Sequence, residues 1–410
     1  MRTVSEDAIR HVFAGLPGTP RVVASGNFAT PRYLLDLLDS AVPQYRLNIL
    51  NAQRGLPDRD GVCYETAFVG PGMRGHPRLS YYPCRLSLVP FLLAQTLRPD
   101  VVLVHTSMPT GGAVSLGVEV NVLPAAIEVA RAHGGLVVAQ ANAAMPVTYG
   151  DAMVPLGVID YLVEVDEPVP VAPPAALDDV SDAIGALVAS LVPQHATLQL
   201  GIGAIPDATL RALTGRRGLR VWSEMFSDGV LDLEKAGCLD PDTPITASFC
   251  LGSAELYDWI DRNPRIRMLR TEKTNDPGTI ARHPTLMSIN SALQVDLFAQ
   301  ANASRIGSRV YSGFGGQTDF IVGAMHSHGG HAIIALRSWH PRAGVSSVVP
   351  LVSGPVTSFQ HSYIVTEQGI ARIWGYDAAS QAQHILDHAA HPQARDGLRA
   401  AGRELGLPLR

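Results

Sequence analysis

The sequence predicts an α/β fold in which a mostly parallel sheet carries helices on both faces. Apolar runs such as Pro99–Ser107 ("PDVVLVHTS") end in polar residues, as strands buried in a parallel sheet do. Helical patterns follow these runs, and the alternation of strand and helix is typical of parallel sheets. The second half of the chain repeats the same strand–turn–helix order, which is compatible with two similar α/β domains.

The first half supplies these elements in alternating order. In the first predicted helix, Thr30 is expected as N-cap and Pro31 at the first helical position. Gly134 is expected to close the second predicted helix. The predicted segments are strand 20–26, helix 30–41, strand 99–107, helix 121–134 and strands 135–142 and 159–166.

A proline-rich stretch, Glu167–Ala176 ("EPVPVAPPAA"), is the best linker in the chain, because proline removes backbone donors and favours extended backbone. We therefore expect an N-terminal domain over residues 1–175 and a C-terminal domain over residues 176–410. The second half continues with helix 178–192, strand–turn–helix segments 196–213, 219–237 and 308–320, strand 331–338 and surface helices within 378–410.

Bulk properties exclude several classes of protein. The 410 residues are 46% hydrophobic, which is enough for large cores, yet no apolar run reaches the roughly 18 residues of a membrane span. The net charge of −5, without basic blocks, argues against nucleic acid as a partner. The N-terminus lacks the pattern of a signal peptide, so we expect a cytoplasmic protein.

Cysteine and histidine spacing does not predict a metal site. Cys63, Cys84, Cys238 and Cys250 are far apart and form no CxxC pair, so reduced, buried thiols are expected. The one dense histidine group, Met325–His331 ("MHSHGGH"), is better explained as the solvated end of a strand than as a set of metal ligands.

The segment Leu219–Gly237 ("LRVWSEMFSDGVLDLEKAG") places a carboxylate, Glu224, at the end of an expected strand. Glu224 is either a solvated or ion-paired residue, or a nucleophile or base at the edge where open α/β sheets bind ligands. Asp228 is expected to shape the Ser-Asp-Gly turn. Glu367, in a polar turn after another apolar run, is a second candidate carboxylate.

Two glycine-rich loops follow predicted strands. Gly201 and Gly203 stand between a strand and a helix, where glycine permits close backbone approach and the helix N-terminus offers amides to an anion. Gly313, Gly315 and Gly316 expose several N–H groups that suit an oxyanion pocket or an extended ligand chain. A tight turn and a flexible loop or bulge are the alternatives without a ligand.

Asn290, in "SINSALQVDL", either binds a ligand or caps the segment that follows it. The first glycine loop does not read GxGxxG. Glu224 alone, near the position of a ribose-binding acid, leaves a nucleotide-dependent oxidoreductase open as a minor alternative.

Taken together and in this order, the segments resemble the acetyl-CoA hydrolase/transferase family, which includes 4-hydroxybutyrate and acetate coenzyme A-transferases. Each segment is weak alone, but their collinear order over most of the chain is specific. They are "VVASGNFATPRYLL", "PDVVLVHTS", "SLGVEV", "MPVTYGDAMV", "IDYLVEVDEPVP", "LQLGIGAIPDA", "SEMFSDGVLDL", "GSAELYDWIDRNP", "SINSALQVDL", "YSGFGGQTDF" and "YIVTEQGIA".

The resemblance implies two related open α/β domains with the active site in the cleft between them. It implies that Glu224 is the catalytic nucleophile and that Asn290 and Gly313 bind coenzyme A (CoA). It also implies CoA contacts by the "GIGAI" loop, that is, by Gly201, Ile202, Gly203, Ala204 and Ile205.

The expected reaction moves CoA from an acyl-CoA to a small carboxylic acid, with ping-pong kinetics through a glutamyl-CoA thioester. The exchange is nearly isoenergetic, so neither ATP nor a metal is needed, and CoA is a substrate rather than a tightly bound cofactor. An acyl-CoA hydrolase using the same glutamate is the alternative, and a non-catalytic acyl-CoA-binding protein is a further one. The family resemblance also suggests a homodimer.

Two positions depart from the family pattern. "PCRLS" places Arg85 where many members have histidine, and "ARIWG" places Trp374 where many have arginine. These departures leave the acyl or acceptor preference open, and Arg85 is able to pair with a carboxylate substrate.

Overall fold

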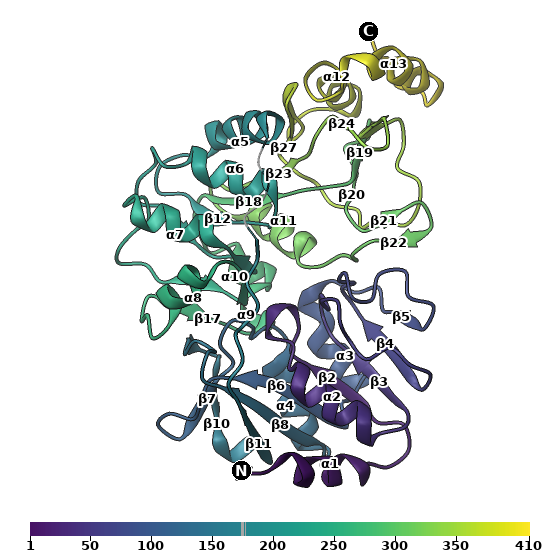
Figure 1. The fold of residues 1–410 in the computed structure, drawn as a ribbon. Helices are drawn as coiled ribbons and strands as arrows, with labels where there is room; N and C mark the ends of the chain where they lie inside the picture. Colours follow the sequence, from purple (N-terminus) through teal and green to yellow (C-terminus); the bar gives the residue numbers. More distant parts are fainter. Residues whose placement is uncertain (174–175, 177) are drawn as a thin grey trace. The chain divides into compact units, whose positions relative to one another are not determined.

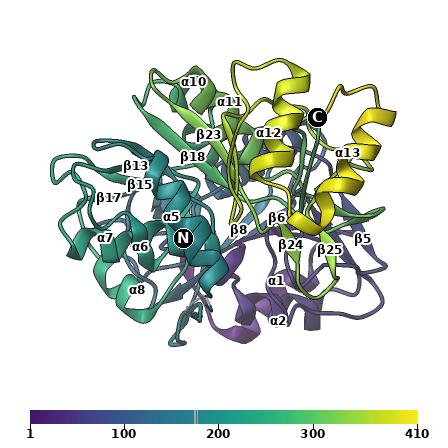
Figure 2. The same cartoon turned by 90° about the horizontal axis from the view of Figure 1, so that it is seen from above.

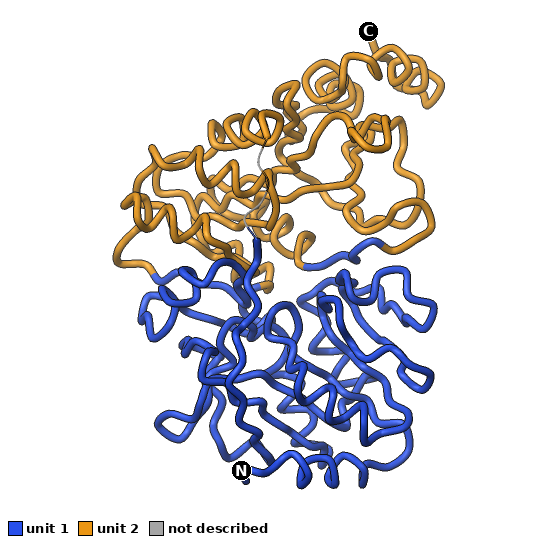
Figure 3. Tube along the Cα trace, viewed as in Figure 1, with its two compact units in different colours: residues 1–173, 244–274, 311–315 blue, residues 174–243, 275–310, 316–410 orange. Residues whose placement is uncertain are grey.

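The computed structural model describes residues 1–173, 176 and 178–410. By packing, the chain divides into two compact units, which Figure 3 draws in different colours. Unit 1 comprises residues 1–173, 244–274 and 311–315, and unit 2 comprises residues 174–243, 275–310 and 316–410.

The units differ from the expected domains in their later segments. The expected boundary between residues 175 and 176 falls among residues 174, 175 and 177, which lie outside the described residues. Beyond it, residues 244–274 and 311–315 pack with unit 1 instead of staying in one C-terminal block. Strand pairing accounts for the first of these returns, because β17 (Ile266–Met268) pairs with both β15 (Ile245–Ala247) and β9 (Tyr149–Gly150).

Unit 1 is built on a sheet of eight parallel strands (Figure 1), and its buried strands are rich in valine and leucine, as the apolar runs predict. The order across the sheet is β1 (Arg2–Thr3), β11 (Tyr161–Val165), β8 (Leu136–Asn142), β6 (Val101–Thr106), β2 (Arg21–Ala24), β3 (Tyr45–Asn48), β4 (Val62–Thr66) and β5 (Leu79–Tyr81).

The chain winds outward from β2 in both directions. It first adds β3, β4 and β5 on one side, then β6, β8 and β11 on the other. Because parallel crossovers are right-handed, α2 (Arg32–Ala41) and α4 (Leu123–Ala132) cover opposite faces. The predicted parallel sheet with helices on both faces is confirmed for this unit.

Smaller elements complete unit 1. β7 (Ala113–Ser115) pairs with β10 (Met153–Pro155). The remaining helices are α1 (Glu6–Ala14), η1 (Asn27–Ala29), η2 (Leu86–Leu88), α3 (Val89–Gln95), η3 (Leu156–Val158), α8 (Ala254–Ile260) and α9 (Thr271–Thr274), and β16 (Phe249–Cys250) is a two-residue strand.

Unit 2 has a six-stranded sheet that is parallel except at one edge. Its order is β13 (Arg220–Val221), β12 (Thr197–Gln199), β18 (Leu286–Asn290), β23 (His331–Ala335), β27 (Tyr363–Thr366) and β28 (Gly369–Arg372), with β28 antiparallel to β27. The helices are α5 (Asp179–Leu191), α6 (Ala204–Ala212), α7 (Asp228–Lys235), α10 (Pro277–Ile280), α11 (Gln317–His326), α12 (Ala378–His388), η4 (Pro392–Ala394) and α13 (Arg395–Glu404).

This sheet reverses its direction of growth between β12 and β18. From β12 the chain passes through α6 to β13 on one side, and from β18 it passes through α11 to β23 on the other. Open α/β sheets bind ligands outside the carboxyl ends of the strands at such a reversal. The loops that follow β12 and β18 are therefore the first place to look for a site.

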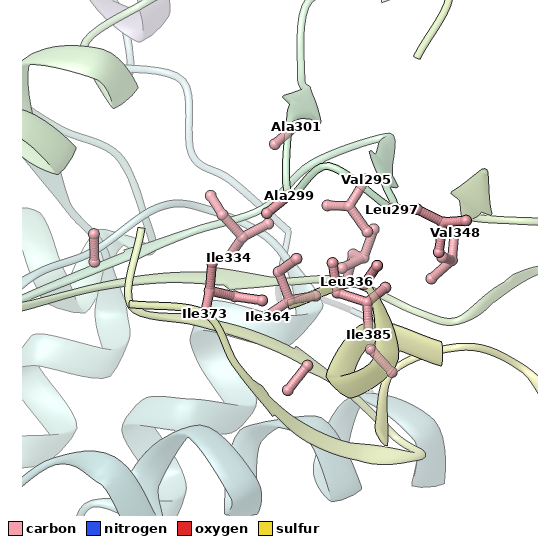
Figure 4. Close-up of a cluster of buried hydrophobic side chains, with 14 of the residues drawn as sticks. Val295, Leu297, Ala299, Ala301, Ile334, Leu336, Val348, Ile364, Ile373 and Ile385 are labelled. Atoms are coloured by element: carbon pink, nitrogen blue, oxygen red, sulfur yellow. The ribbon is translucent and has the colours of Figure 1, made fainter. Parts of the chain in front are cut away.

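A hydrophobic cluster in unit 2 fixes a small accessory sheet beside the strands (Figure 4). The accessory sheet consists of β20 (Ala301–Asn302), β19 (Gln294–Asp296) and β26 (Val348–Val349). Leu336, after β23, and Val348 are 3% and 1% exposed within this cluster. Burial of such side chains stabilises by roughly 1.5–3 kcal/mol each, so the loop between residues 336 and 348 is anchored at both ends.

Short elements lie outside the main sheets of unit 2. β21 (Arg305–Ile306) pairs with β22 (Arg309–Val310), β24 (Trp339–His340) pairs with β25 (Val345–Ser346), and β14 (Met225–Phe226) follows Glu224. The predicted surface helices of the tail are α12 and α13, which lie side by side (Figures 1 and 2).

Two local predictions were wrong. Thr30 does not cap α2; it ends η1, and its hydroxyl donates to the Asn27 carbonyl oxygen at 3.0 Å, so Pro31 takes the N-cap position. The histidine group 325–331 is not the end of one strand, because His326 ends α11 and His331 begins β23. Among the described residues, no helix combines the length and the apolar composition needed to cross a bilayer.

His361 should make the stability of the protein sensitive to acid. It is fully buried, and neither ring nitrogen has a hydrogen-bond partner among the described residues. Burial lowers the pKa of His361 from 6.5 to about 4. The unfolded chain therefore takes up this proton more readily, and the free energy of unfolding should fall by roughly 3 kcal/mol as the pH drops from 6.5 to about 4.

Urea unfolding of wild type and His361→Leu at about pH 7.5 and about pH 4.5 measures this contribution. The variant should lose less stability on acidification than wild type does. His388→Leu, which removes an exposed imidazole, serves as the control and should retain the wild-type loss. Equal losses in wild type and His361→Leu would contradict the assignment.

Candidate active site

Glu224 lies three residues beyond the end of β13. Both of its neighbours, Ser223 and Met225, contact Leu200, which directly follows strand β12. The Ser223 hydroxyl accepts from the Leu200 N–H at 3.1 Å and donates to the Leu200 carbonyl oxygen at 3.2 Å. Met225 forms an isolated antiparallel bridge with the same Leu200. The backbone on either side of Glu224 is thus fixed, which fixes where its side chain begins.

Two donors of unit 2 hold the Glu224 carboxylate. The Asn275 side-chain amide donates to Oε2 over 2.8 Å, and Asn275 is fully buried. The Gly316 backbone N–H, at the start of α11, donates as well. Both bonds are charge-assisted when the carboxylate is ionised, so they favour that form.

Burial is nevertheless the largest influence and raises the pKa of Glu224 to about 7. The Asn275 amide lowers the pKa, the charge of buried Asp319 raises it, and the Gly316 N–H lowers it. Near neutral pH this carboxylate is divided between its two forms. A carboxyl group with a pKa perturbed in this way is typical of a functional site.

Gly316 has no room for a side chain. A Cβ built there would lie 1.7 Å from Glu224 Oε2 and 2.2 Å from Asn275 Nδ2. Its φ of −95° is accessible to any residue, so the requirement for glycine is steric and not conformational. Of the residues predicted for the site, Glu224 and Gly316 are therefore brought into direct contact.

The "GIGAI" loop joins β12 to the N-terminus of α6, as predicted. Gly203 takes the N-cap position with a φ of +110°, a region open to glycine. Ile202 is 51% exposed, so an apolar side chain points into solvent at the tip of the loop. The first amides of α6 lack carbonyl partners within the helix and are available to an anion.

Asn290 ends β18 and joins a buried polar network. Its amide donates to Gln199 Oε1 at 3.0 Å and to Ser288 Oγ at 2.8 Å, and the Ser288 hydroxyl donates to Gln199 Oε1 at 2.7 Å. No helix starts after Asn290; the next element is β19. The capping alternative is therefore wrong, and Asn290 instead fixes the carboxyl ends of β12 and β18 relative to each other.

A pocket of about 530 Å³ opens at this reversal of the unit 2 sheet. Residues from the carboxyl ends of three neighbouring strands line it: Ile202, Ala204 and Ile205 after β12, Ser291, Ala292 and Leu293 after β18, and Leu336 and Arg337 after β23. Trp339, His340 and Arg342 of the anchored loop add an aromatic ring and polar groups. The pocket thus combines apolar walls with a few convergent polar groups, as small-molecule sites do.

Gly313 and Gly315 belong to unit 1, and the surrounding packing leaves no room for a side chain at either position. A Cβ at Gly313 would lie 2.8 Å from the Ala67 carbonyl oxygen, and one at Gly315 would lie 2.9 Å from the Phe68 ring. Both have positive φ, +112° and +58°. Arg85 pairs with Gly315 in an isolated parallel bridge, which places the first departure from the family pattern beside this loop.

The other candidate carboxylates have structural tasks. Asp228 is the first residue of α7 and so lies in a helix, not in a turn. Glu367 Oε2 accepts from the Ser338 N–H at 3.0 Å, and its other oxygen accepts from the Ser338 hydroxyl. Burial raises the pKa of Glu367, but these bonds outweigh it and the pKa is lowered. Trp374, the second departure, is 62% exposed.

Sequence reasoning missed Asn275, Arg337 and Trp339. Asn275 lies in the turn "TNDPG", and no local pattern marks it as a partner of Glu224. Arg337 lies in segment 331–338, which predicts only a strand, and Trp339 lies just beyond that segment. Within the described residues, no group of three or more His, Cys, Asp or Glu side chains is placed to hold a metal ion.

Gly316→Ala should destabilise the protein by about 1–3 kcal/mol, because the added methyl forces Glu224 and Asn275 out of place. Thermal and urea unfolding measure the loss. The matched control is Gly215→Ala in the same unit, where an added Cβ meets nothing within 4 Å. Equal stabilities of the two variants would show that Glu224 is not confined as described.

Two family models match the chain. Residues 65–173 match the acetyl-CoA hydrolase/transferase N-terminal domain, and residues 252–401 match the C-terminal domain of the same family. Among solved structures, RipA from Yersinia pestis superposes with a TM-score of 0.90 at 26% identity, covering 99% of this chain and 98% of that one.

Curated relatives agree with the family models. The chain is 39% identical over 333 residues to the 4-hydroxybutyrate coenzyme A transferase of Clostridium kluyveri, covering 78% of this chain and 76% of the relative. It is 38% identical over 415 residues to the succinyl-CoA:acetate/propanoyl-CoA:succinate CoA transferase of Fasciola hepatica, covering 95% and 86%. The chain belongs to the acetyl-CoA hydrolase/transferase family.

Proposed function

We propose that this protein is a CoA-transferase that moves CoA from an acyl-CoA to a small carboxylic acid, with Glu224 as the nucleophile. The observation that carries the proposal is the setting of Glu224: a partly desolvated carboxylate held by Asn275 and the Gly316 N–H, in a chain of this family. The names of the relatives above include 4-hydroxybutyrate, acetate and succinate, which supports a small acid as acceptor.

The first half of the reaction uses Glu224 as an anion. A carboxylate oxygen attacks the thioester carbonyl carbon, the carbon–sulfur bond breaks, and CoA leaves as a thiolate while a mixed anhydride remains. The thiolate then attacks the Glu224 carbonyl carbon of the anhydride. This step expels the acid of the donor as its carboxylate and leaves a glutamyl-CoA thioester.

The second half reverses these steps with a different acid. The acceptor carboxylate attacks the glutamyl thioester, and the returning thiolate takes the new acyl group, which frees Glu224. Bonds and charges balance without an oxidant, a nucleotide or a net proton. Each attack builds an oxyanion, and the Asn275 amide and the Gly316 N–H are donors placed at the carboxyl group that reacts.

The pocket at the reversal of the unit 2 sheet is the proposed CoA site. Its wall includes Ile202, Ala204 and Ile205 of the "GIGAI" loop, and the free amides of α6 suit the negative charges of CoA. Asn290 supports this wall through Gln199. The family resemblance assigns Gly313 to CoA binding, and the N–H groups of Gly313, Gly315 and Gly316 suit an oxyanion pocket or an extended ligand chain.

An acyl-CoA hydrolase is the second candidate, because the family contains both activities. Water would replace the acceptor acid at the glutamyl thioester, and the same residues would serve. Dependence of product formation on an added acid separates the two. A purely binding role fits less well, because it gives no reason for a carboxyl with a raised pKa at position 224.

A cytoplasmic location and a homodimer belong to the same proposal. The cysteines at positions 63, 84, 238 and 250 form no disulfide with one another, which suits a reducing compartment. The dimer rests on the family resemblance, and analytical ultracentrifugation of the purified protein tests it.

The glutamyl thioester can be trapped by reduction. Incubation with an acyl-CoA and then borohydride should lower the intact mass by roughly 14 Da, as –COOH becomes –CH₂OH, and peptide mapping should place the change at Glu224. Glu224→Gln should show no change, whereas Glu404→Gln, at an exposed position, should behave as wild type. A reduced carboxyl group elsewhere, or none with any acyl-CoA tried, would overturn the assignment of Glu224.

The rate of thioester formation should rise with pH through about 7, because only ionised Glu224 attacks and its pKa is raised to about 7. Asn275→Ala removes a bond that lowers the pKa and should move the midpoint to higher pH. Asp319→Asn removes a charge that raises the pKa and should move it to lower pH. Single-turnover measurements across pH give the midpoints, and shifts in the same direction for both variants would contradict this account.

A further inference from the structure

The proposed CoA pocket carries an excess of groups that attract anions. Arg337, His340 and Arg342 line it, and Asp178 is the one carboxylate among its lining residues. CoA has two chemically different ends, a phosphorylated adenosine and an uncharged pantetheine arm. A pocket with this lining suits the phosphorylated end, whose oxygens match the planar fork of a guanidinium.

Arg337 is already engaged by Asp178. Its guanidinium donates to Asp178 Oδ2 and to the Ser181 hydroxyl, the latter at 3.1 Å. The Arg337 and Asp178 side chains are 31% and 49% exposed. An ion pair this open to water is weak, because solvent screens its charges, so an incoming anion can replace it at little cost.

The two carboxylate oxygens of Asp178 accept hydrogen bonds from different donors. Oδ1 accepts the Ser181 N–H at 2.9 Å and caps α5, while Oδ2 accepts from Arg337. The pKa of Asp178 is lowered to about 2, chiefly by Arg337, so acid does not release the pair under ordinary assay conditions.

The backbone that carries Arg337 is held firmly. Ser338, next in the chain and fully buried, donates through its N–H and hydroxyl to Glu367, and its carbonyl oxygen accepts from the Ser347 N–H at 2.9 Å. Leu336, on the other side, lies in the hydrophobic cluster. Exchange of partners at Arg337 therefore requires movement of side chains and not of the loop.

We propose that Arg337 binds a phosphate group of CoA and that Asp178 is an internal competitor for the same guanidinium. The inference rests on the proposed CoA-transferase function. Trp339, two residues further on in the same wall, offers a flat face to the adenine that accompanies the phosphates. The pair sets the affinity for CoA below what Arg337 alone would give.

Calorimetric titration of the full chain with CoA and with pantetheine tests the proposal. Asp178→Asn keeps an oxygen to cap α5 but removes the charge and the second acceptor. It should bind CoA roughly two- to fivefold more tightly at low ionic strength, with pantetheine affinity unchanged. Arg337→Gln should bind CoA about tenfold more weakly. In the Arg337→Gln background, Asp178→Asn should bring no gain.

The matched control is Asp182→Asn, which breaks the exposed Asp182–Arg211 pair between α5 and α6, outside the pocket lining. It should leave CoA affinity at the wild-type value. Unchanged or weaker CoA binding by Asp178→Asn, or an equal gain for pantetheine, would overturn the competitor role. Failure of wild type to bind CoA at all would instead count against the proposed function, so the two failures are distinguishable.

Discussion

A carboxylate proposed as a nucleophile must shed water without losing its charge, and the contacts of Glu224 bear on both of these opposed demands. Burial alone would leave the group protonated. The Asn275 amide and the Gly316 N–H favour the ionised form, and the result is a pKa of about 7. The absence of a side chain at residue 316 follows directly, because any Cβ there would occupy the space of the carboxylate.

The topology of unit 2 decides where the rest of the site lies. The sheet grows in opposite directions from β12 and β18, so the loops after these strands diverge and leave a pocket between them. The network of Gln199, Ser288 and Asn290 links the ends of these two strands. The hydrophobic cluster then holds the opposite wall through Leu336 and Val348. Leu336 belongs both to this cluster and to the lining of the pocket, so the packing of the core determines part of the site's geometry.

Much of this architecture could be predicted from the sequence. Apolar runs with polar ends gave the parallel strands, and the position of Glu224 beyond a strand followed from the pattern of "LRVWSE". What could not be predicted depends on long-range pairs. Asn275 is 51 residues from Glu224, and Arg337 is 159 residues from Asp178. Local periodicity carries no information on such partners.

The packing of residues 244–274 with unit 1 could not be predicted from the sequence, again because it depends on long-range pairs. β17 is a three-residue strand, Ile-Arg-Met, and nothing in it indicates that β9 is its neighbour. The expected cap at Thr30 failed differently: the chain forms a turn of η1 first, so its hydroxyl is used one turn earlier. Local signals identify element types more securely than their ends or partners.

The divided composition of unit 1 has a consequence for biosynthesis. The Val69 N–H donates to the Ser312 carbonyl oxygen at 2.5 Å, and the Leu86 N–H to the Gly315 carbonyl oxygen at 2.8 Å. A ribosome that has finished β11 has made every strand of the eight-stranded sheet, but not residues 244–274 and 311–315 of the same unit. Unit 1 is therefore incomplete while residues 178–243 are synthesised. It can be completed only after residue 315 has been added. The order of synthesis therefore differs from the order of packing, because the segments that complete unit 1 are made after residues of unit 2.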